Sequence, residues 1–191
     1  WSRRALFILD HPRDEKKFQE CVRRFFEALR EKEPKRTREL ERVERDTAQL
    51  VRAHPDFWNA WETRAWTLRR LGRYEEARAA LDHVLELHPG EPNAYHELGL
   101  LLRETGHLEE ARAQMLRALS IAPRDAATLM NLAICEAELG RFGDAEERLK
   151  AAEERIGAEN VAPLREYISA LRNGTLSPDT ARPQAPVGSF R

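Results

Sequence analysis

A pattern of 34 residues occurs three times in register between Trp61 and Gly157. The copies align on three glycines, each followed two residues later by a large apolar residue and five residues later by an alanine. The aligned residues are Gly72, Gly106 and Gly140, with Ala77, Ala111 and Ala145. A fixed period of this length is typical of stacked helical hairpins, none of which can bury its apolar face alone. Such an array presents a long surface, so the sequence favours binding over catalysis.

The period divides the central part of the chain into three expected repeats, at about residues 56–89, 90–123 and 124–157. Each repeat is expected to contain two helices. The six expected helices span about 57–71, 74–88, 91–105, 108–121, 125–139 and 142–156. Small residues such as Gly99 and Ala133 would let the two helices of a hairpin approach closely, while large residues such as Trp61 fill the space between hairpins.

Residues 1–55 are expected to form a further, degenerate helical hairpin. Its first helix is expected to begin near Pro12, since proline suits a first helical turn. Pro34 is expected to end that helix, because the residue before a proline is pushed out of helical geometry. Thr37 would then cap the second helix of this hairpin.

The segment after Gly157 contains one more apolar stripe at helical spacing. It predicts a helix over residues 158–173 that covers the open apolar end of the third repeat. The stripe consists of Val161, Leu164, Tyr167, Ile168 and Leu171. Residues 174–191 contain several prolines and glycines and few apolar side chains, so we expect a tail without regular structure.

The charge and cysteine content exclude several classes of function. The chain has 32 Lys and Arg against 33 Asp and Glu, a net charge of -1, whereas a nucleic-acid-binding face needs an excess of positive charge. Cys21 and Cys135 lie in no Cys/His cluster, so neither a metal nor another cofactor is expected. No apolar run approaches the ~18 residues that a membrane span requires, so no membrane insertion is expected.

The chain begins with Trp1 rather than methionine. We expect a cytoplasmic location, with an upstream signal or membrane anchor left open. An alternative therefore also stays open: the array could be an accessory or regulatory domain of a larger enzyme or membrane-associated protein.

The repeats resemble the tetratricopeptide repeat family, and the second copy matches the family pattern best. Repeats one and three keep part of the pattern, including Trp61 and Tyr74 in the first. The matching residues of the second copy are Tyr95, Leu98, Gly99, Gly106, Ala111, Ala118, Leu119 and Pro123. The resemblance implies an all-α fold, a right-handed superhelix of hairpins, and a concave groove that binds a protein partner as a non-catalytic scaffold.

In that family the first helix of each repeat lines the concave groove. By this resemblance the inward, partner-binding positions of the chain are Asn59, Glu62, Thr63, Trp66 and Arg70 in repeat one, Asn93, His96, Glu97, Leu100 and Glu104 in repeat two, and Met130, Asn131, Ile134 and Glu138 in repeat three.

Trp66, Leu100 and Ile134 are equivalent residues one period apart, so they are expected to form an apolar line along the groove. Together with the inward glutamates, this line favours an apolar or amphipathic peptide that carries some basic residues. The family members that hold a chaperone's C-terminal carboxylate use cations and amides at positions where this chain has Glu62, Trp66 and Glu97. Binding of that kind is therefore disfavoured.

Two alternatives to an open apolar groove remain at this stage. The apolar line could instead be core, with the N-terminal helix packed over Trp66, because apolar stripes at helical spacing are usually buried. The groove could also be occupied by the tail of the chain itself, which carries Pro186, Val187 and Phe190.

No catalytic constellation is present in the sequence. His54 and His88 each precede a proline at the end of an expected helix, where a histidine favourably meets the negative end of the helix dipole. The segment from Phe57 to Trp66 resembles the W-x-x-R-x-W repeat of prenyltransferase alpha subunits, a class of supporting subunit. Only one copy has this signature, so a non-enzymatic scaffold is the favoured interpretation.

Overall fold

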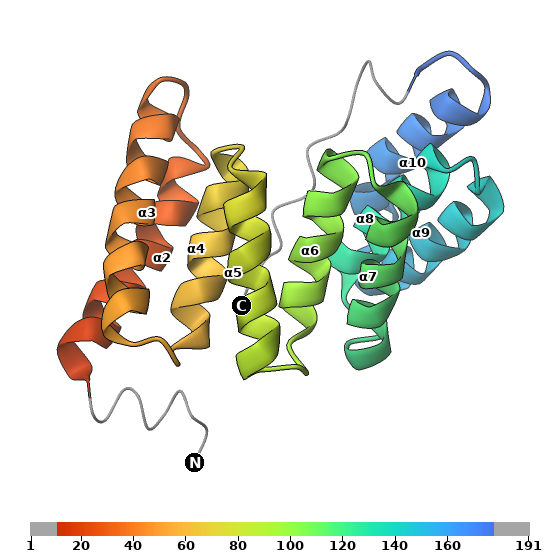
Figure 1. Ribbon diagram of the computed structural model, residues 1–191. Coiled ribbons are helices and arrows are strands. Elements are labelled where there is room, and N and C mark those ends of the chain that lie inside the picture. Colours follow the sequence, from red (N-terminus) through yellow and green to blue (C-terminus); the bar gives the residue numbers. More distant parts are fainter. Residues whose placement is uncertain (1–10, 178–191) are drawn as a thin grey trace. The chain divides into compact units, whose positions relative to one another are not determined.

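The computed structural model describes residues 11–177, and this part of the chain is all-α (Figure 1). The chain divides into two compact units, residues 1–94 and residues 95–191. The six helices expected for the repeats all lie within one residue of the predicted bounds. The periodic pattern therefore located the helices correctly.

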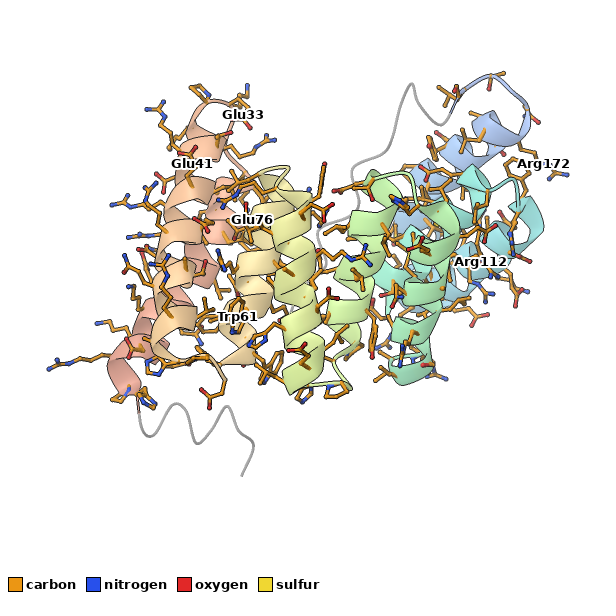
Figure 2. All side chains as sticks on the ribbon, viewed as in Figure 1. Glu33, Glu41, Trp61, Glu76, Arg112 and Arg172 are labelled. Atoms are coloured by element: carbon orange, nitrogen blue, oxygen red, sulfur yellow. The ribbon has the colours of Figure 1, made fainter. Side chains whose placement is uncertain are left out.

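The first unit contains two helical hairpins. Its helices are α2 (Pro12–Ala28), α3 (Lys35–Ala53), α4 (Trp58–Arg70) and α5 (Tyr74–Leu87). Helix α3 packs on both α2 and α4, and α2 also contacts α4. One apolar cluster joins the first three helices, with Phe25 from α2, Leu50 from α3 and Trp66 from α4 among its members. Charged side chains such as Glu33 and Glu41 lie on the outer surface of the α2–α3 hairpin (Figure 2).

The second unit, from Tyr95 onward, contains most of α6 and four further helices. The helices are α6 (Pro92–Glu104), α7 (Leu108–Ile121), α8 (Ala126–Glu138), α9 (Phe142–Ile156) and α10 (Ala158–Arg172). Helix α8 packs between α7 and α9, and α10 packs on both α9 and α8. Because α8 has neighbours on several sides, every residue from Thr128 to Ala137 is buried. This explains why α8 is the most continuously apolar of the helices.

The three glycines of the repeat end α4, α6 and α8 in the same way. Gly72 has a φ of +74°, a left-handed conformation that glycine adopts without strain. The backbone N–H of Arg73 donates to the carbonyl of Leu68 at 2.9 Å, and that of Gly72 donates to the carbonyl of Arg69 at 3.0 Å. This is the Schellman ending. The bond between residues five apart recurs in the other two repeats. There the backbone N–H of His107 donates to the carbonyl of Leu102, and that of Arg141 donates to the carbonyl of Glu136.

The connection between α2 and α3 differs from the prediction. Helix α2 ends at Ala28, well before Pro34, because the residues that follow form turns and offer few apolar side chains to pack. Helix α3 begins at Lys35 with Pro34 in the N-cap position, so the prediction that Thr37 caps it was wrong. The Thr37 hydroxyl instead donates to the Glu33 carboxylate at 2.8 Å.

Helix α10 matches the helix predicted after Gly157. Its five apolar residues are all buried, and they share one cluster with Leu149 and Ala152 of α9. Its outer side is polar, with Arg172 pointing away from the helix bundle (Figure 2). The expected irregular tail lies mostly outside the described residues, which end at 177.

Candidate functional site

The inward positions of α4 are mostly buried. Asn59, Glu62 and Thr63 all have little exposed surface, and Arg70 is half-buried. The Thr63 hydroxyl donates to the Asn59 carbonyl at 3.0 Å, a bond within the helix itself. These side chains therefore offer little surface to a ligand in the first unit.

The apolar line predicted from the repeat is not exposed. Trp66, Leu100 and Ile134 have only 8%, 3% and 1% of their surface exposed. The Trp66 ring lies 5.9 Å from the ring of Phe25, a residue of α2. The prediction of an open apolar line was wrong at Trp66, because α2 packs against α4 as well as against α3.

The third member of the line is covered in a similar way at the other end of the chain. Ile134 and its neighbour Met130 belong to the apolar cluster that contains Tyr167 and Ile168 of α10. Helix α10 was expected to cover the end of the third repeat, and it also packs on α8. The two flanking helices therefore bury inward positions that the repeat pattern alone assigns to a groove.

A polar cluster joins the N-terminal halves of α6 and α8. His96 Nδ1 lies 2.5 Å from the hydroxyl of Thr128. Thr128 donates from its backbone N–H and its hydroxyl to Asp125, at 2.7 Å and 2.5 Å. Asn131 Nδ2 donates to the carbonyl of Ala127 at 2.9 Å and lies 3.4 Å from His96 Nε2. The inward sides of the two helices thus meet through polar groups.

Two members of this cluster were not among the predicted site residues. Asp125 is the N-cap of α8, and Thr128 is the third residue of that helix. An Asp three residues before a Thr at an expected helix start is a capping signal that could have located both. Their link to His96 required the structure, since it joins two repeats.

An ion pair joins the C-terminal ends of the same two helices. Arg103 Nε of α6 lies 4.0 Å from Glu138 Oε2 of α8, and both side chains are almost fully buried. Glu138 was predicted to be an acidic residue available to a partner, and this burial contradicts that prediction. Arg103 was not among the predicted residues, although it lies on the inward side of α6, one turn after Leu100.

Other inward residues of α6 are more accessible. Asn93, His96, Glu97 and Glu104 are each half-buried. Of these, His96, Glu97 and Glu104 belong to the second unit. They form a polar row on one helix, beside residues of the same helix that are fully buried.

A second charged cluster lies inside the second unit, away from the inward positions. Glu136 of α8 has no exposed surface. Arg112 Nε of α7 donates to Glu136 Oε1 at 3.0 Å, and Arg148 Nε of α9 lies 3.5 Å from Glu136 Oε2. Burial raises the pKa of the Glu136 carboxyl, while the two arginines act in the opposite direction. Repeats one and two have Leu68 and Leu102 at the equivalent position.

The histidines at the helix ends have structural contacts. His54 is the C-cap of α3, and its Nε2 lies 2.8 Å from Asp14 Oδ2 on α2. His88 is the C-cap of α5, and its ring stacks on Trp58 with 4.8 Å between centroids. Among residues 11–177, no group of three His, Cys, Asp or Glu side chains is placed to hold a metal ion.

Comparison with known proteins agrees with the repeat pattern. Two sequence profiles described as "Tetratricopeptide repeat" match residues 59–124 and 96–160, which together are more than half of the chain. The chain is a tetratricopeptide repeat protein. Proteins with this repeat are protein-interaction scaffolds, and the fold is typically non-catalytic. None of the curated proteins compared with the chain matches it.

Solved tetratricopeptide repeat structures share the fold. MamA aligns with a TM-score of 0.63 and 18% identity over 74% of this chain and 82% of its own. YrrB, described as a TPR protein with an unusual peptide-binding site, aligns with a TM-score of 0.58 and 16% identity over 73% and 71%. The O-GlcNAc transferase of Thermobaculum terrenum gives a TM-score of 0.63 and 19% identity over 75% of this chain and 27% of the enzyme.

The length and apolarity of the helices also bear on membrane insertion. Of the helices between residues 11 and 177, none is both long enough and apolar enough to span a membrane.

Proposed function

We propose that this protein binds a peptide segment of a partner protein along the inward side of α6, and that the partner carries basic residues. The proposal is supported chiefly by the half-buried polar row of His96, Glu97 and Glu104. Polar side chains that are neither fully solvated nor packed in a core suit a surface that orders an extended peptide through hydrogen bonds and charge.

The charges of the row favour a basic partner. Glu97 and Glu104 are half-buried carboxylates on the same helix, about 10 Å apart along its axis at 1.5 Å per residue. Glu62 and Glu138 are buried, so they contribute less to such a surface than the repeat pattern implied. Lysine or arginine side chains of a peptide would meet Glu97 and Glu104 with favourable charge.

The buried apolar positions change the type of peptide expected. Leu100 lies between the two glutamates on the helix, but it is almost fully buried. The partner therefore gains little from burying apolar side chains there, and hydrogen bonds and charge contribute more of its affinity. This favours a polar, basic peptide over a strongly apolar one.

A double substitution of Glu97→Gln and Glu104→Gln tests the proposal. Peptides of random sequence would first be selected by display on the wild-type protein, and their affinities measured by fluorescence anisotropy. We expect the selected peptides to be rich in Lys and Arg. The double variant should bind them about tenfold more weakly, because two partly exposed charge pairs together contribute roughly 1.4 kcal/mol.

A matched control changes the same charge elsewhere. Glu110 of α7 and Glu154 of α9 are exposed, and Glu110→Gln with Glu154→Gln should leave the affinity unchanged. The difference in peptide affinity between the two double variants should shrink at high salt, because salt screens exposed charges. Selected peptides without a basic bias, or equal affinities for both variants, would contradict the proposal.

A further inference from the structure

A row of exposed arginines lies along one face of α3. Its positions recur at intervals of four and three residues, so they share one side of the helix. They are Arg38, Arg42, Arg45 and Arg52, with Gln49 at the one position of the row that has no arginine. All five residues are exposed, and Figure 2 shows nitrogen-bearing side chains extending outward from this helix. We call the four arginines the arginine stripe.

The gap in the arginine stripe is filled from the neighbouring helix. Lys17 of α2 donates from Nζ to Gln49 Oε1 at 2.8 Å, which brings a fifth positive charge to the same face. Positive charge therefore continues from Arg38 to Arg52, a length of about 21 Å at 1.5 Å per residue.

The stripe has no counter-charge within residues 11–177. None of its four arginines forms an ion pair with another side chain in this range. Other cations of the same hairpin do have acidic partners one turn away, as in the pairs of Arg23 with Glu27 and of Lys35 with Glu31. Like charges one turn apart destabilise a helix, so the stripe carries a repulsion that a partner of opposite charge would relieve.

Two acidic residues of α3 are directed to other helices. Glu44 Oε1 lies 3.2 Å from Arg64 Nη2 of α4, and Asp46 Oδ2 lies 3.5 Å from Arg24 Nη1 of α2. Their charges are thus engaged at the contacts of α3 with its neighbours inside the first unit. The exposed face keeps its excess of positive charge.

We infer that the arginine stripe binds an acidic helix of a partner protein. A helix repeats its side chains at intervals of four and three residues, so a row of Asp or Glu on a partner helix lying along α3 meets successive cations in register. Arginine suits such a contact, because a guanidinium and a carboxylate can form two parallel hydrogen bonds. The inference does not depend on the function proposed above, since α3 is not part of the inward side of α6.

The narrowness of the stripe favours a helix over a broad polyanion. By the helical repeat, Glu39 and Glu41 lie on opposite sides of the N-terminal half of the stripe, and the whole chain has a net charge of -1. A nucleic-acid duplex or an anionic membrane would bring phosphates over these glutamates as well as over the arginines. A single helix, about 10 Å wide, can contact the stripe alone.

Two designed helical peptides test the inference. Both consist of alanine, glutamine and the same number of glutamates. In the aligned peptide the glutamates recur at intervals of four and three residues, whereas in the scattered peptide they recur every five residues and point to all sides of the helix. We expect the aligned peptide to bind wild type about tenfold more tightly, with a loss of affinity as salt is added, because the charge pairs are exposed. An NMR titration measures both affinities, and the backbone amides that shift should lie in α3.

A variant of the stripe and a matched control locate the contact on the protein. The stripe variant changes all four arginines to glutamine and should bind the aligned peptide about tenfold more weakly than wild type. The control removes the same charge from four exposed arginines elsewhere and should keep the wild-type affinity. Its substitutions are Arg78→Gln, Arg124→Gln, Arg155→Gln and Arg172→Gln.

Several results would overturn the inference. One is equal affinity of wild type for the two peptides, and another is binding that shifts amides only outside α3. Vesicles containing phosphatidylserine and a DNA duplex are tested at the same salt concentration. If either binds more tightly than the aligned peptide and loses its affinity in the stripe variant, the ligand of the stripe is a broad polyanion and not a helix. The comparison of peptides uses the wild-type protein, so it does not depend on how the variants fold.

Discussion

Gly99→Val is expected to destabilise the second unit by about 3 kcal/mol, at the upper end of the usual cost of overpacking. Gly99 lies on α6 where α7 approaches closely. A Cβ atom at this position would lie 2.6 Å from Cγ of Met115 and 3.1 Å from the backbone carbonyl oxygen of Ala111. Met115 is fully buried and the contact is to Cγ, near the base of its side chain, while the carbonyl oxygen is fixed by α7. The branched side chain of valine therefore has no unstrained position.

The measurement is urea unfolding followed by circular dichroism, with thermal melting as a second probe. Gly143 provides a matched control, because it is also a helical glycine and a Cβ there would have no atom within 4 Å. Gly143→Val should leave stability unchanged or slightly increased, since valine has a better helix propensity than glycine. Equal urea midpoints for wild type and Gly99→Val would show that α6 and α7 are not in such close contact.

A double-mutant cycle identifies the atoms that cause the clash. Met115→Ala removes both methionine carbons that lie nearest to Gly99, and alone it should cost about 2–5 kcal/mol as a buried large-to-small change. Gly99→Ala should be less harmful in that background than in wild type, by about 1 kcal/mol or more, because neighbouring residues are not additive. Additive effects would place the clash on the Ala111 carbonyl alone.

The close approach at Gly99 belongs to the part of the fold that the sequence does predict. The repeat places small residues at equivalent positions, and it locates the glycines that end each first helix. Both are local requirements. The small residues concern the contact between the two helices of one hairpin, and each glycine concerns the backbone conformation of a single residue. A pattern repeated every 34 residues therefore contains enough information for the helices and their pairing.

The accessibility of the inward positions did not follow from the repeat. The pattern gives Trp66 and Ile134 equivalent positions in α4 and α8, but it does not show what else packs there. Helices α2 and α10 lie outside the three repeats, and each contributes apolar residues to a cluster that contains one of these positions. Their contacts depend on how flanking segments fold back, which periodicity does not encode.

The pairing of the buried charges also does not follow from the sequence. Arg103 and Glu138 are on different repeats, and Glu136 has partners on two other helices. The sequence does show one warning sign, since Glu136 stands where Leu68 and Leu102 stand in the other copies. It does not show which arginines supply the counter-charge.

Glu136→Leu is expected to stabilise the second unit by about 1–2 kcal/mol near neutral pH, because replacing a buried charged group with an apolar one of similar size is often favourable. Leucine already occupies the equivalent positions of the other two repeats, so the space suits it. The two arginines would not be left buried, since 22% of the Arg112 side chain and 25% of the Arg148 side chain are exposed. Arg112 also keeps Asp144 at 3.8 Å.

The pH dependence distinguishes this explanation from a simple gain in packing. The pKa of Glu136 is raised in the folded protein, chiefly by burial. Its contribution to stability is therefore fully present below the unfolded pKa and is lost as the pH rises through the folded pKa. The advantage of Glu136→Leu over wild type should be largest near pH 7 and should shrink as the pH falls toward about 4.3, the ordinary range of a glutamate. A constant difference between pH 7 and that range would attribute the gain to packing alone.

Arg112→Leu, in the same cluster, is expected to destabilise the second unit. It leaves the Glu136 carboxylate buried with only Arg148 beside it, and the hydrogen bond at 3.0 Å is lost. We expect a loss of about 3 kcal/mol, the cost of removing one partner from a buried ion pair. The double variant with Glu136→Leu should recover most of this loss, because the carboxylate that needed a partner is gone. If Arg112→Leu is harmless and Glu136→Leu is destabilising, then Arg148 alone satisfies the carboxylate, and the cluster stabilises the fold despite its burial.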